Sequence, residues 1–165
     1  MSDKTLVAYA TMYGSTREVA EAVAVALRED GSVVDVRPAA EVKRLADYGP
    51  VILGAPLIMH RFHKDARKFL ARNREELQDR PVAIFALGPC TQDEQEWSDC
   101  RGQLADELQQ LEWLSPVEAE LFGGRFDPEL LRFPLNKFAG AAEASDARDW
   151  EAIRRWATGL EGRMV

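Results

Sequence analysis

The amino-acid sequence predicts a three-layer α/β domain, in which helices cover both faces of a doubly wound, five-stranded parallel sheet. Three observations support this fold class: short apolar runs recur five times, amphipathic helical patterns separate them, and no internal repeat or low-complexity tract interrupts the alternation. Right-handed connections between such strands favour the order 2-1-3-4-5. With 165 residues and no evident linker, we expect residues 1–165 to form a single domain.

The five expected strands are short and apolar throughout. A continuous apolar run is typical of a strand buried on both faces, whereas strict alternation is typical of a strand with one face in water. The runs are Thr5–Ala10, Val33–Val36, Val51–Ala55, Val82–Leu87 and Val117–Phe122.

Four stretches between and after these strands carry apolar residues at helical spacing. Gly31 follows the first stretch and marks its C-terminal end. The residues that define the four patterns are Val19, Val23 and Leu27; Ala66, Phe69, Leu70 and Leu77; Trp97, Leu104, Leu108 and Leu111; and Trp150, Ile153, Ala157 and Leu160.

Composition narrows the class of protein. The formal net charge is −7, which is poorly suited to binding the phosphate backbone of a nucleic acid. The basic residues from Arg61 to Arg74 are interpreted as a solvated helix face. We therefore expect no nucleic-acid partner. Cys90 and Cys100 lack a CxxC spacing, and residues 1–4 lack a signal-peptide pattern. Together these features lead us to expect a cytoplasmic protein.

The fold predicts where a ligand binds. In doubly wound sheets, ligands bind beyond the carboxyl ends of the strands, near the switch point of the strand order. Three expected loops lie at that edge: Thr11–Thr16, Pro56–His63 and Gly88–Trp97.

The first loop gathers four hydroxyl residues, Thr11, Tyr13, Ser15 and Thr16, around Gly14. One interpretation is a capping box, because Ser15-Thr-Arg-Glu matches S-x-x-E. The other is a phosphate site, because a helix N-terminus attracts anions and hydroxyls donate further hydrogen bonds. Neither the P-loop nor the dinucleotide fingerprint is present, which leaves a terminal monophosphate as the ligand.

The run TMYGST (11–16), placed after the first strand of an alternating α/β chain, resembles the phosphate loop of flavodoxins. The resemblance implies a flavodoxin-like fold and FMN as the cofactor. It also implies that Thr11, Tyr13, Gly14, Ser15 and Thr16 hold the phosphate, with Met12 contributing its backbone.

Four further segments resemble the flavodoxin branch that includes the bacterial menaquinone-dependent protoporphyrinogen oxidase. They are VILGAPLIMHRFHKDARKFL (51–70), FALGP (85–89), FGGRFD (122–127) and DWEAIRRWA (149–157). This resemblance covers nearly the whole chain.

The second loop is expected to contact the isoalloxazine ring, which needs a flat apolar wall and a few polar groups. Pro56, Leu57, Ile58, Met59 and His60 supply both kinds of group. Two histidines spaced H-x-x-H without Cys or a carboxylate cluster make a poor metal site, so we expect no metal.

The third loop begins with Gly88, Pro89, Cys90 and Thr91. Backbone amides of this loop are expected at the pyrimidine edge of the ring. Cys90 itself is interpreted as a small buried apolar residue. Trp97 has two interpretations of equal weight: it stacks on the ring, or it belongs to the core as the first apolar residue of the next helix.

The connection from Gly123 to Arg148 is longer than most loops and is apolar over residues 126–138. It is either a lid packed on the core or a hydrophobic surface for a quinone, a porphyrinogen-like substrate, a membrane or a protein partner.

The sequence thus favours an FMN-dependent redox protein, and no catalytic residue is identified. Three roles are open for it. It is a dehydrogenase that resembles the menaquinone-dependent protoporphyrinogen enzyme of heme biosynthesis, or an electron carrier between protein partners, or an NAD(P)H-quinone reductase. A fourth possibility is a protein without redox activity, namely a binding module with a degenerate flavin site, because fold alone does not determine function.

Overall fold

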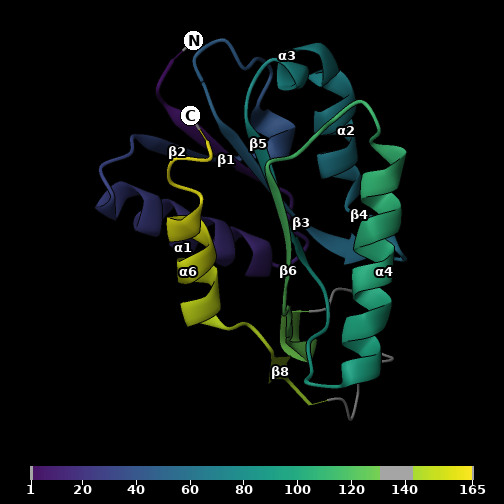
Figure 1. Cartoon of the computed structure of the whole chain (residues 1–165). Coiled ribbons are helices and arrows are strands. Elements are labelled where there is room, and N and C mark those ends of the chain that lie inside the picture. The colour runs from purple at the N-terminus through teal and green to yellow at the C-terminus, as the bar shows by residue number, and fades with distance from the viewer. Residues whose placement is uncertain (1, 131–142, 165) are drawn as a thin grey trace.

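The structure is a computed structural model and describes residues 2–130 and 143–164. Its main sheet is parallel, with the order β2-β1-β3-β5-β6, which is the predicted order 2-1-3-4-5 when the five parallel strands are counted along the chain (Figure 1). The fold class is confirmed. These strands are β1 (Thr5–Tyr9), β2 (Val34–Pro38), β3 (Val51–Ile58), β5 (Val82–Leu87) and β6 (Glu118–Phe122).

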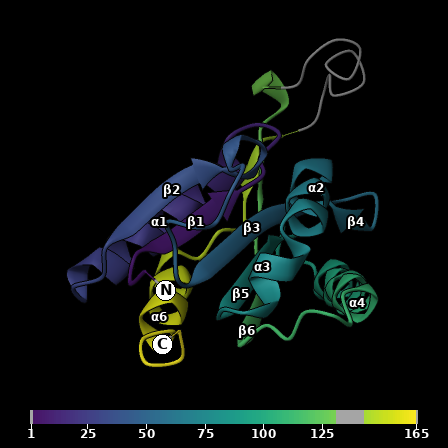
Figure 2. The ribbon, with the colours of Figure 1, turned by 90° about the horizontal axis from the view of Figure 1, so that it is seen from above.

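Helices cover the two faces of the sheet, as Figure 2 shows from above. Helices α1 (Ser15–Glu29) and α6 (Trp150–Gly159) pack on one face, and α2 (Lys64–Arg72), α3 (Arg74–Gln78) and α4 (Glu94–Gln110) lie on the other. A short 3-10 turn, η1 (Ala39–Glu41), follows β2.

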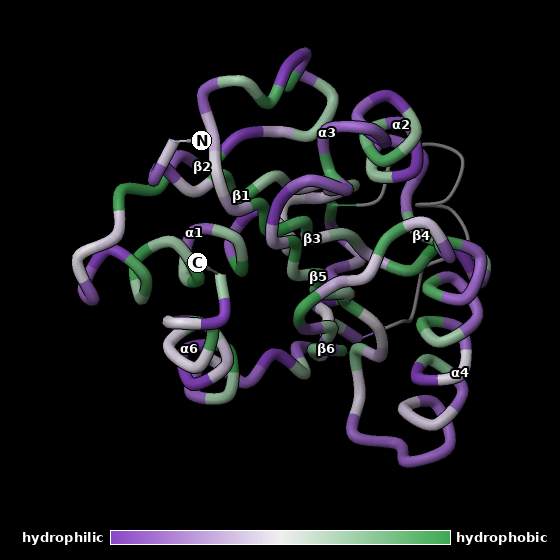
Figure 3. Tube along the Cα trace, turned by 45° about the horizontal axis from the view of Figure 1, so that its top comes forward, coloured by the Kyte–Doolittle hydropathy of each residue, from purple (hydrophilic) through white to green (hydrophobic). Residues whose placement is uncertain are grey.

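Alternate residues of β1 enter two different cores. Leu6 and Ala8 pack with α2 and α4, whereas Val7 and Tyr9 pack with α1 and α6. All four are buried, which explains why the strand reads as an uninterrupted apolar run. Figure 3 shows the same result as hydrophobic colour along the central strands.

Gly54 and Phe85 are register partners on β3 and β5. A Cβ atom on Gly54 would lie 2.0 Å from Cζ of Phe85, so the aromatic ring fills the space that a side chain would need. Phe85 continues into an aromatic cluster, with ring centroids 5.9 Å from Phe122 and 5.9 Å from Trp156. This contact fixes the two strands that flank the expected ring site.

The helical pattern from Ala66 to Leu77 is interrupted once, which the periodicity did not predict. Asn73 is buried between α2 and α3, and its side-chain amide donates to the carbonyl of Phe69 at 3.0 Å. This local hydrogen bond competes with the helical pattern and separates the two helices.

The long connection after β6 begins and ends in a two-stranded antiparallel ribbon. Strand β7 (Arg125–Phe126) pairs with β8 (Ser145–Asp146), and a 3-10 turn, η2 (Pro128–Leu130), follows β7. The predicted hydrophobic surface at 126–138 falls largely on residues 131–142, which lie outside the described residues. Within the described ranges, no helix has the length and apolar character needed to cross a membrane.

Candidate functional site

Three loops meet at the carboxyl edge of the sheet. Strands β1, β3 and β5 are parallel neighbours, so their C-terminal ends point the same way, toward the lower side of Figure 1. The loops after them contain residues 10–14, 59–60 and 88–93. The predicted meeting of these loops at one edge follows from this topology.

The loop after β1 closes on itself. The Oγ1 atom of Thr11 accepts a hydrogen bond from the backbone N–H of Gly14 at 2.8 Å, and Gly14 has φ of 94°, a conformation that glycine adopts readily. Helix α1 then begins at Ser15. Met12 is 51% exposed, and Tyr13 and Ser15 are half-buried.

The N-terminus of α1 has no side-chain cap. The first backbone bond into the helix runs from the N–H of Glu18 to the carbonyl of Gly14 at 3.1 Å. The N–H groups of Ser15, Thr16 and Arg17 donate to no described residue. These unpaired donors and the helix dipole favour an anion at this position.

Thr16 adds a second unpaired group. Its side chain is fully buried, and its Oγ1 atom has no hydrogen-bond partner among the described residues. A buried hydroxyl without a partner costs on the order of 1–3 kcal/mol, so a native structure usually provides one. A phosphate ester at the start of α1 is a group with the right acceptors.

The alternative interpretation of this loop, a capping box, is wrong. Gly14, which has no side chain, is the N-cap, and Ser15 is already the first helical residue. Glu18 turns away from the helix start, because its carboxylate accepts from Arg148 at 2.6 Å and from Arg125 at 3.4 Å. The two guanidinium groups neutralise a carboxylate that would repel a bound anion.

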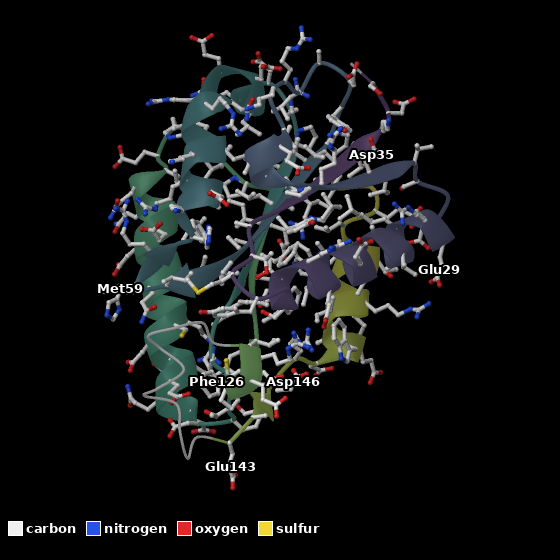
Figure 4. All side chains as sticks on the ribbon, turned by 180° about the vertical axis from the view of Figure 1, so that it is seen from behind. Glu29, Asp35, Met59, Phe126, Glu143 and Asp146 are labelled. Atoms are coloured by element: carbon white, nitrogen blue, oxygen red, sulfur yellow. The ribbon has the colours of Figure 1, made fainter. Side chains whose placement is uncertain are left out.

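The ribbon strands β7 and β8 and the residues next to them, 124–126 and 145–148, are called the ribbon segment. Within it, Arg148 and Asp146 hold the segment against α1. The side chain of Arg148 is 4% exposed and donates to both carboxylate oxygens of Asp146, at 2.9 and 2.8 Å. These hydrogen bonds hold the pKa of Asp146 below its usual range, and they raise the pKa of Arg148. Figure 4 shows Asp146 beside Phe126 at the ribbon.

The segment after β3 is a hairpin rather than the open loop that the sequence predicted. Strand β3 continues through Pro56, Leu57 and Ile58, all half-buried, and pairs with the antiparallel strand β4 (Arg61–Phe62). Met59 and His60 form a two-residue turn with φ of 50° and 71°. Such turns normally carry Asn or Gly, so the positive φ angles of these two residues store strain.

The side chain of Met59 is 88% exposed and points away from the body of the molecule (Figure 4). The hairpin itself is fastened from α4. Glu107, with a side chain only 7% exposed, accepts from the backbone N–H of Phe62 at 3.1 Å and pairs with Nε of Arg61 at 3.5 Å. A carboxylate in α4 thus holds the segment that contains the expected ring wall.

The loop after β5 is tied to the ribbon segment by backbone bonds. The N–H of Gly88 donates to Phe122 at 2.9 Å, and the N–H of Gly124 donates to Pro89 at 2.8 Å. A Cβ atom on Gly124 would lie 2.9 Å from the carbonyl oxygen of Gly88, so the two segments touch through their backbones. The ribbon segment therefore contacts both helix α1, through Glu18, and the third loop, through Pro89.

Cys90 is half-buried, whereas a fully buried side chain was predicted. Burial raises the pKa of its thiol, and the negative charge of Glu96 raises it further. The thiol is therefore protonated at neutral pH and is a poor nucleophile.

Comparison with known proteins identifies the family. Residues 6–136 match the family described as flavodoxin domain. The chain belongs to this family. The predicted resemblance is thereby confirmed, and family membership implies a flavin cofactor.

Two curated relatives are named protoporphyrinogen IX dehydrogenase [quinone]. The protein of Escherichia coli K12 is 30% identical over 89 residues, which are 51% of this chain and 48% of that one. The protein of Leishmania major is 25% identical over 173 residues, covering 95% of this chain and 74% of that one. The matched region thus spans about half of the length of the bacterial relative.

Solved flavodoxin structures share the fold. The oxidised flavodoxin 1 of Bacillus cereus superposes with a TM-score of 0.63 at 17% identity, covering 98% of this chain and 99% of that one. Flavodoxin 2 of the same organism gives 0.60 at 20% identity, covering 97% and 99%.

Trp97 lies in the first turns of α4, just after the third loop. It is half-buried against the core of the α2/α4 face, its indole N–H donates to the carbonyl of Thr91 at 2.9 Å, and it lines a groove with residues of β6. No hydrogen bond among the described residues joins it to the hairpin. Its stacking on the ring stays a prediction.

No local pattern in the sequence marks Glu107, Arg125 or Arg148 as important. Their partners lie 45, 107 and 130 residues away along the chain. Each is a charged residue inside an ordinary polar stretch, and only the folded chain shows what it contacts. Within the described ranges, no group of three or more potential metal ligands occurs.

Proposed function

We propose that this flavodoxin domain binds FMN at the carboxyl edge of its sheet and transfers electrons from a reduced substrate to a quinone-type acceptor. The observation that carries the proposal is the start of α1, where three unpaired N–H groups adjoin the buried, unpartnered hydroxyl of Thr16. Among flavins, FMN has the terminal phosphate that such a site favours.

The phosphate is assigned to the first loop. Thr11, Tyr13, Ser15 and Thr16 contribute hydroxyl groups, and the backbone of Met12 and Gly14 shapes the turn. Because Thr11 already accepts from Gly14, its hydroxyl hydrogen remains available to a phosphate oxygen. Glu18 is neutralised by its arginine partners and so does not oppose a dianion.

The ring is assigned to the space between the second and third loops. In this assignment the half-buried Pro56, Leu57 and Ile58 form one wall, and Met59 and His60 lie at its exposed tip. The backbone of Gly88, Pro89 and Cys90 is assigned to the opposite side, and Trp97 to a place beside the third loop. When bound, the flavin supplies one- or two-electron transfer. The protein residues hold it, limit its exposure to water and admit the partner.

The relatives named protoporphyrinogen IX dehydrogenase [quinone] support a quinone acceptor and a porphyrinogen-like substrate. A turnover assay, together with a reductive titration of the flavin, tests this role. In the assay, we expect the protein to oxidise protoporphyrinogen with a menaquinone analogue as the acceptor. A long-lived semiquinone without such turnover would indicate a carrier of electrons between proteins, and rapid oxidation of NADPH would indicate a reductase.

Thr16→Val tests the cofactor site itself. Valine has the shape of threonine, so the apo protein should be equally stable or more stable, because an unsatisfied buried hydroxyl is removed. Affinity for FMN should fall about 10- to 100-fold, the effect of losing one hydrogen bond to a charged group. Riboflavin, which lacks the phosphate, should bind both proteins equally.

Thr158→Val is the matched control, because Thr158 is exposed on α6. It should leave both affinities unchanged. Equal loss of FMN and riboflavin binding in Thr16→Val would place the phosphate elsewhere. A protein that stays colourless after FMN is added would end the proposal and favour a binding module.

A further inference from the structure

A second concave site lies on the α2/α4 face, away from the loops assigned to the flavin. It is a groove of about 340 Å³ between β4, α2, α3 and α4. This volume falls within the range of small-molecule sites. The groove contains three arginines, Arg61, Arg67 and Arg74, in a chain whose net charge is −7.

The three guanidinium groups are only partly used by the protein. Arg61 engages Glu107 through Nε, and Arg67 donates from Nε to the carbonyl of Phe62 at 3.0 Å. Arg74 makes no hydrogen bond to a described residue. The terminal nitrogens of all three therefore have donors left for an anion, because each guanidinium carries five N–H groups.

The lining of the groove includes a single carboxylate, that of Glu107. This carboxylate is buried and already accepts from Phe62 and Arg61. It is therefore occupied, and the surplus charge that faces a ligand is positive.

Two of the positive groups lie together and the third is separate. Arg61 and Arg67 meet at Phe62, whereas Arg74 is the first residue of the next helix, α3, and its Cζ atom lies 5.2 Å from the ring centroid of Trp113. Between these two sets, Ala71 and Leu111 supply apolar surface, and the buried Leu70 lies beneath them. Arg74 and the indole of Trp113 together present a flat edge.

We propose that this groove binds a small dianion: a molecule with two acidic groups at opposite ends of a flat, apolar body. The acidic groups pair with the separated arginines, and the body lies on the apolar surface and the indole. Arginine suits both tasks, since it pairs with carboxylates in bidentate geometry and stacks on aromatic surfaces. The inference does not depend on a flavin being bound.

The test uses the full-length protein and naphthalene-2,6-dicarboxylate as the probe. We expect one molecule to bind per chain, to shift the NMR resonance of the Trp113 indole N–H, and to bind more weakly as salt is added. Arg74→Gln should weaken binding about tenfold, as expected for loss of one charge-assisted pair. Because the side chain of Arg74 makes no hydrogen bond to a described residue, this variant should fold normally.

Arg101→Gln is the matched control, because Arg101 lies over Trp97 on α4 and does not line the groove. It should bind the probe like the parent protein. Two results would overturn the proposal: no shift at Trp113 at millimolar probe, or equal affinity in Arg74→Gln and the parent. Binding of inorganic phosphate or naphthalene-2-carboxylate as tight as that of the dianion would overturn the two-ended ligand.

Discussion

The loops that follow β1 and β3 end at the same edge of the sheet, yet different forces hold them. The loop after β1 is fixed by neighbours in sequence: Thr11 bonds Gly14, glycine supplies the left-handed turn, and α1 starts at once. The hairpin after β3 has unfavourable turn residues and is held by Glu107, which lies 45 residues away from its partner Phe62.

This difference indicates how the two halves of the proposed flavin site respond to change. A locally determined loop tolerates the loss of a distant contact, whereas the hairpin depends on one. We therefore expect distant substitutions to disturb the ring side of the site more than the phosphate side.

The largest expected effect is at Glu107. Glu107→Leu leaves the buried N–H of Phe62 without an acceptor and should lower the free energy of unfolding by about 2–3 kcal/mol. Glu107→Gln keeps an acceptor oxygen and should recover most of that loss. Urea unfolding measures both, and amide exchange at Phe62 should quicken in the leucine variant alone. Equal stability of all three proteins would show that the hairpin holds without α4.

Next is the strain in the turn. His60→Gly removes a non-glycine residue from φ of 71° and should raise the free energy of unfolding by about 1 kcal/mol, after allowance for the greater freedom of glycine. Gly14→Ala is the opposite case, since it places a side chain at φ of 94°, and should lower stability by a similar amount. If both variants shift the denaturation midpoint the same way, the contrast between the loops fails.

A smaller effect is expected at Arg148. Arg148→Gln breaks its pairs with Glu18 and Asp146, but those carboxylates are 48% and 42% exposed and can be hydrated. The loss of stability should stay below about 1 kcal/mol, because the exposed carboxylates regain water and glutamine keeps a polar side chain at the buried position. Thermal unfolding measures it, and a loss as large as that of Glu107→Leu would show that α1 also depends on a distant contact.

The smallest effect concerns pH. Because the pKa of Asp146 is lowered in the folded state, its contribution to stability is present above about pH 4, the unfolded pKa, and is lost as the pH falls through the folded pKa. Comparing the parent with Asp146→Asn at pH 7 and at pH 3 checks this. The stability difference between them should shrink at the lower pH, and a constant difference would contradict it.

Sequence reasoning succeeded where the determining contacts are short in range. The uninterrupted run from Leu6 to Tyr9 predicted a strand buried on both faces, and the crowding of hydroxyls around Gly14 located the start of α1. It failed at Glu18, because S-x-x-E describes a capping box only when the serine precedes the helix.

The hairpin was missed for a different reason. Met59-His60 lacks the Asn or Gly that usually marks a two-residue turn, so nothing in the local sequence indicated a reversal. The acceptor that stabilises it, Glu107, sits within a helix rich in similar acidic residues. Only the packing of α4 beside β4 distinguishes this glutamate from its neighbours.

The absence of a side chain at Gly54 has a consequence for how this domain can evolve. Since the ring of Phe85 occupies that space, neither position can change alone without an overlap or a void. A larger residue at Gly54 is admissible only together with a smaller one at Phe85, so viable descendants should inherit the two substitutions as a pair.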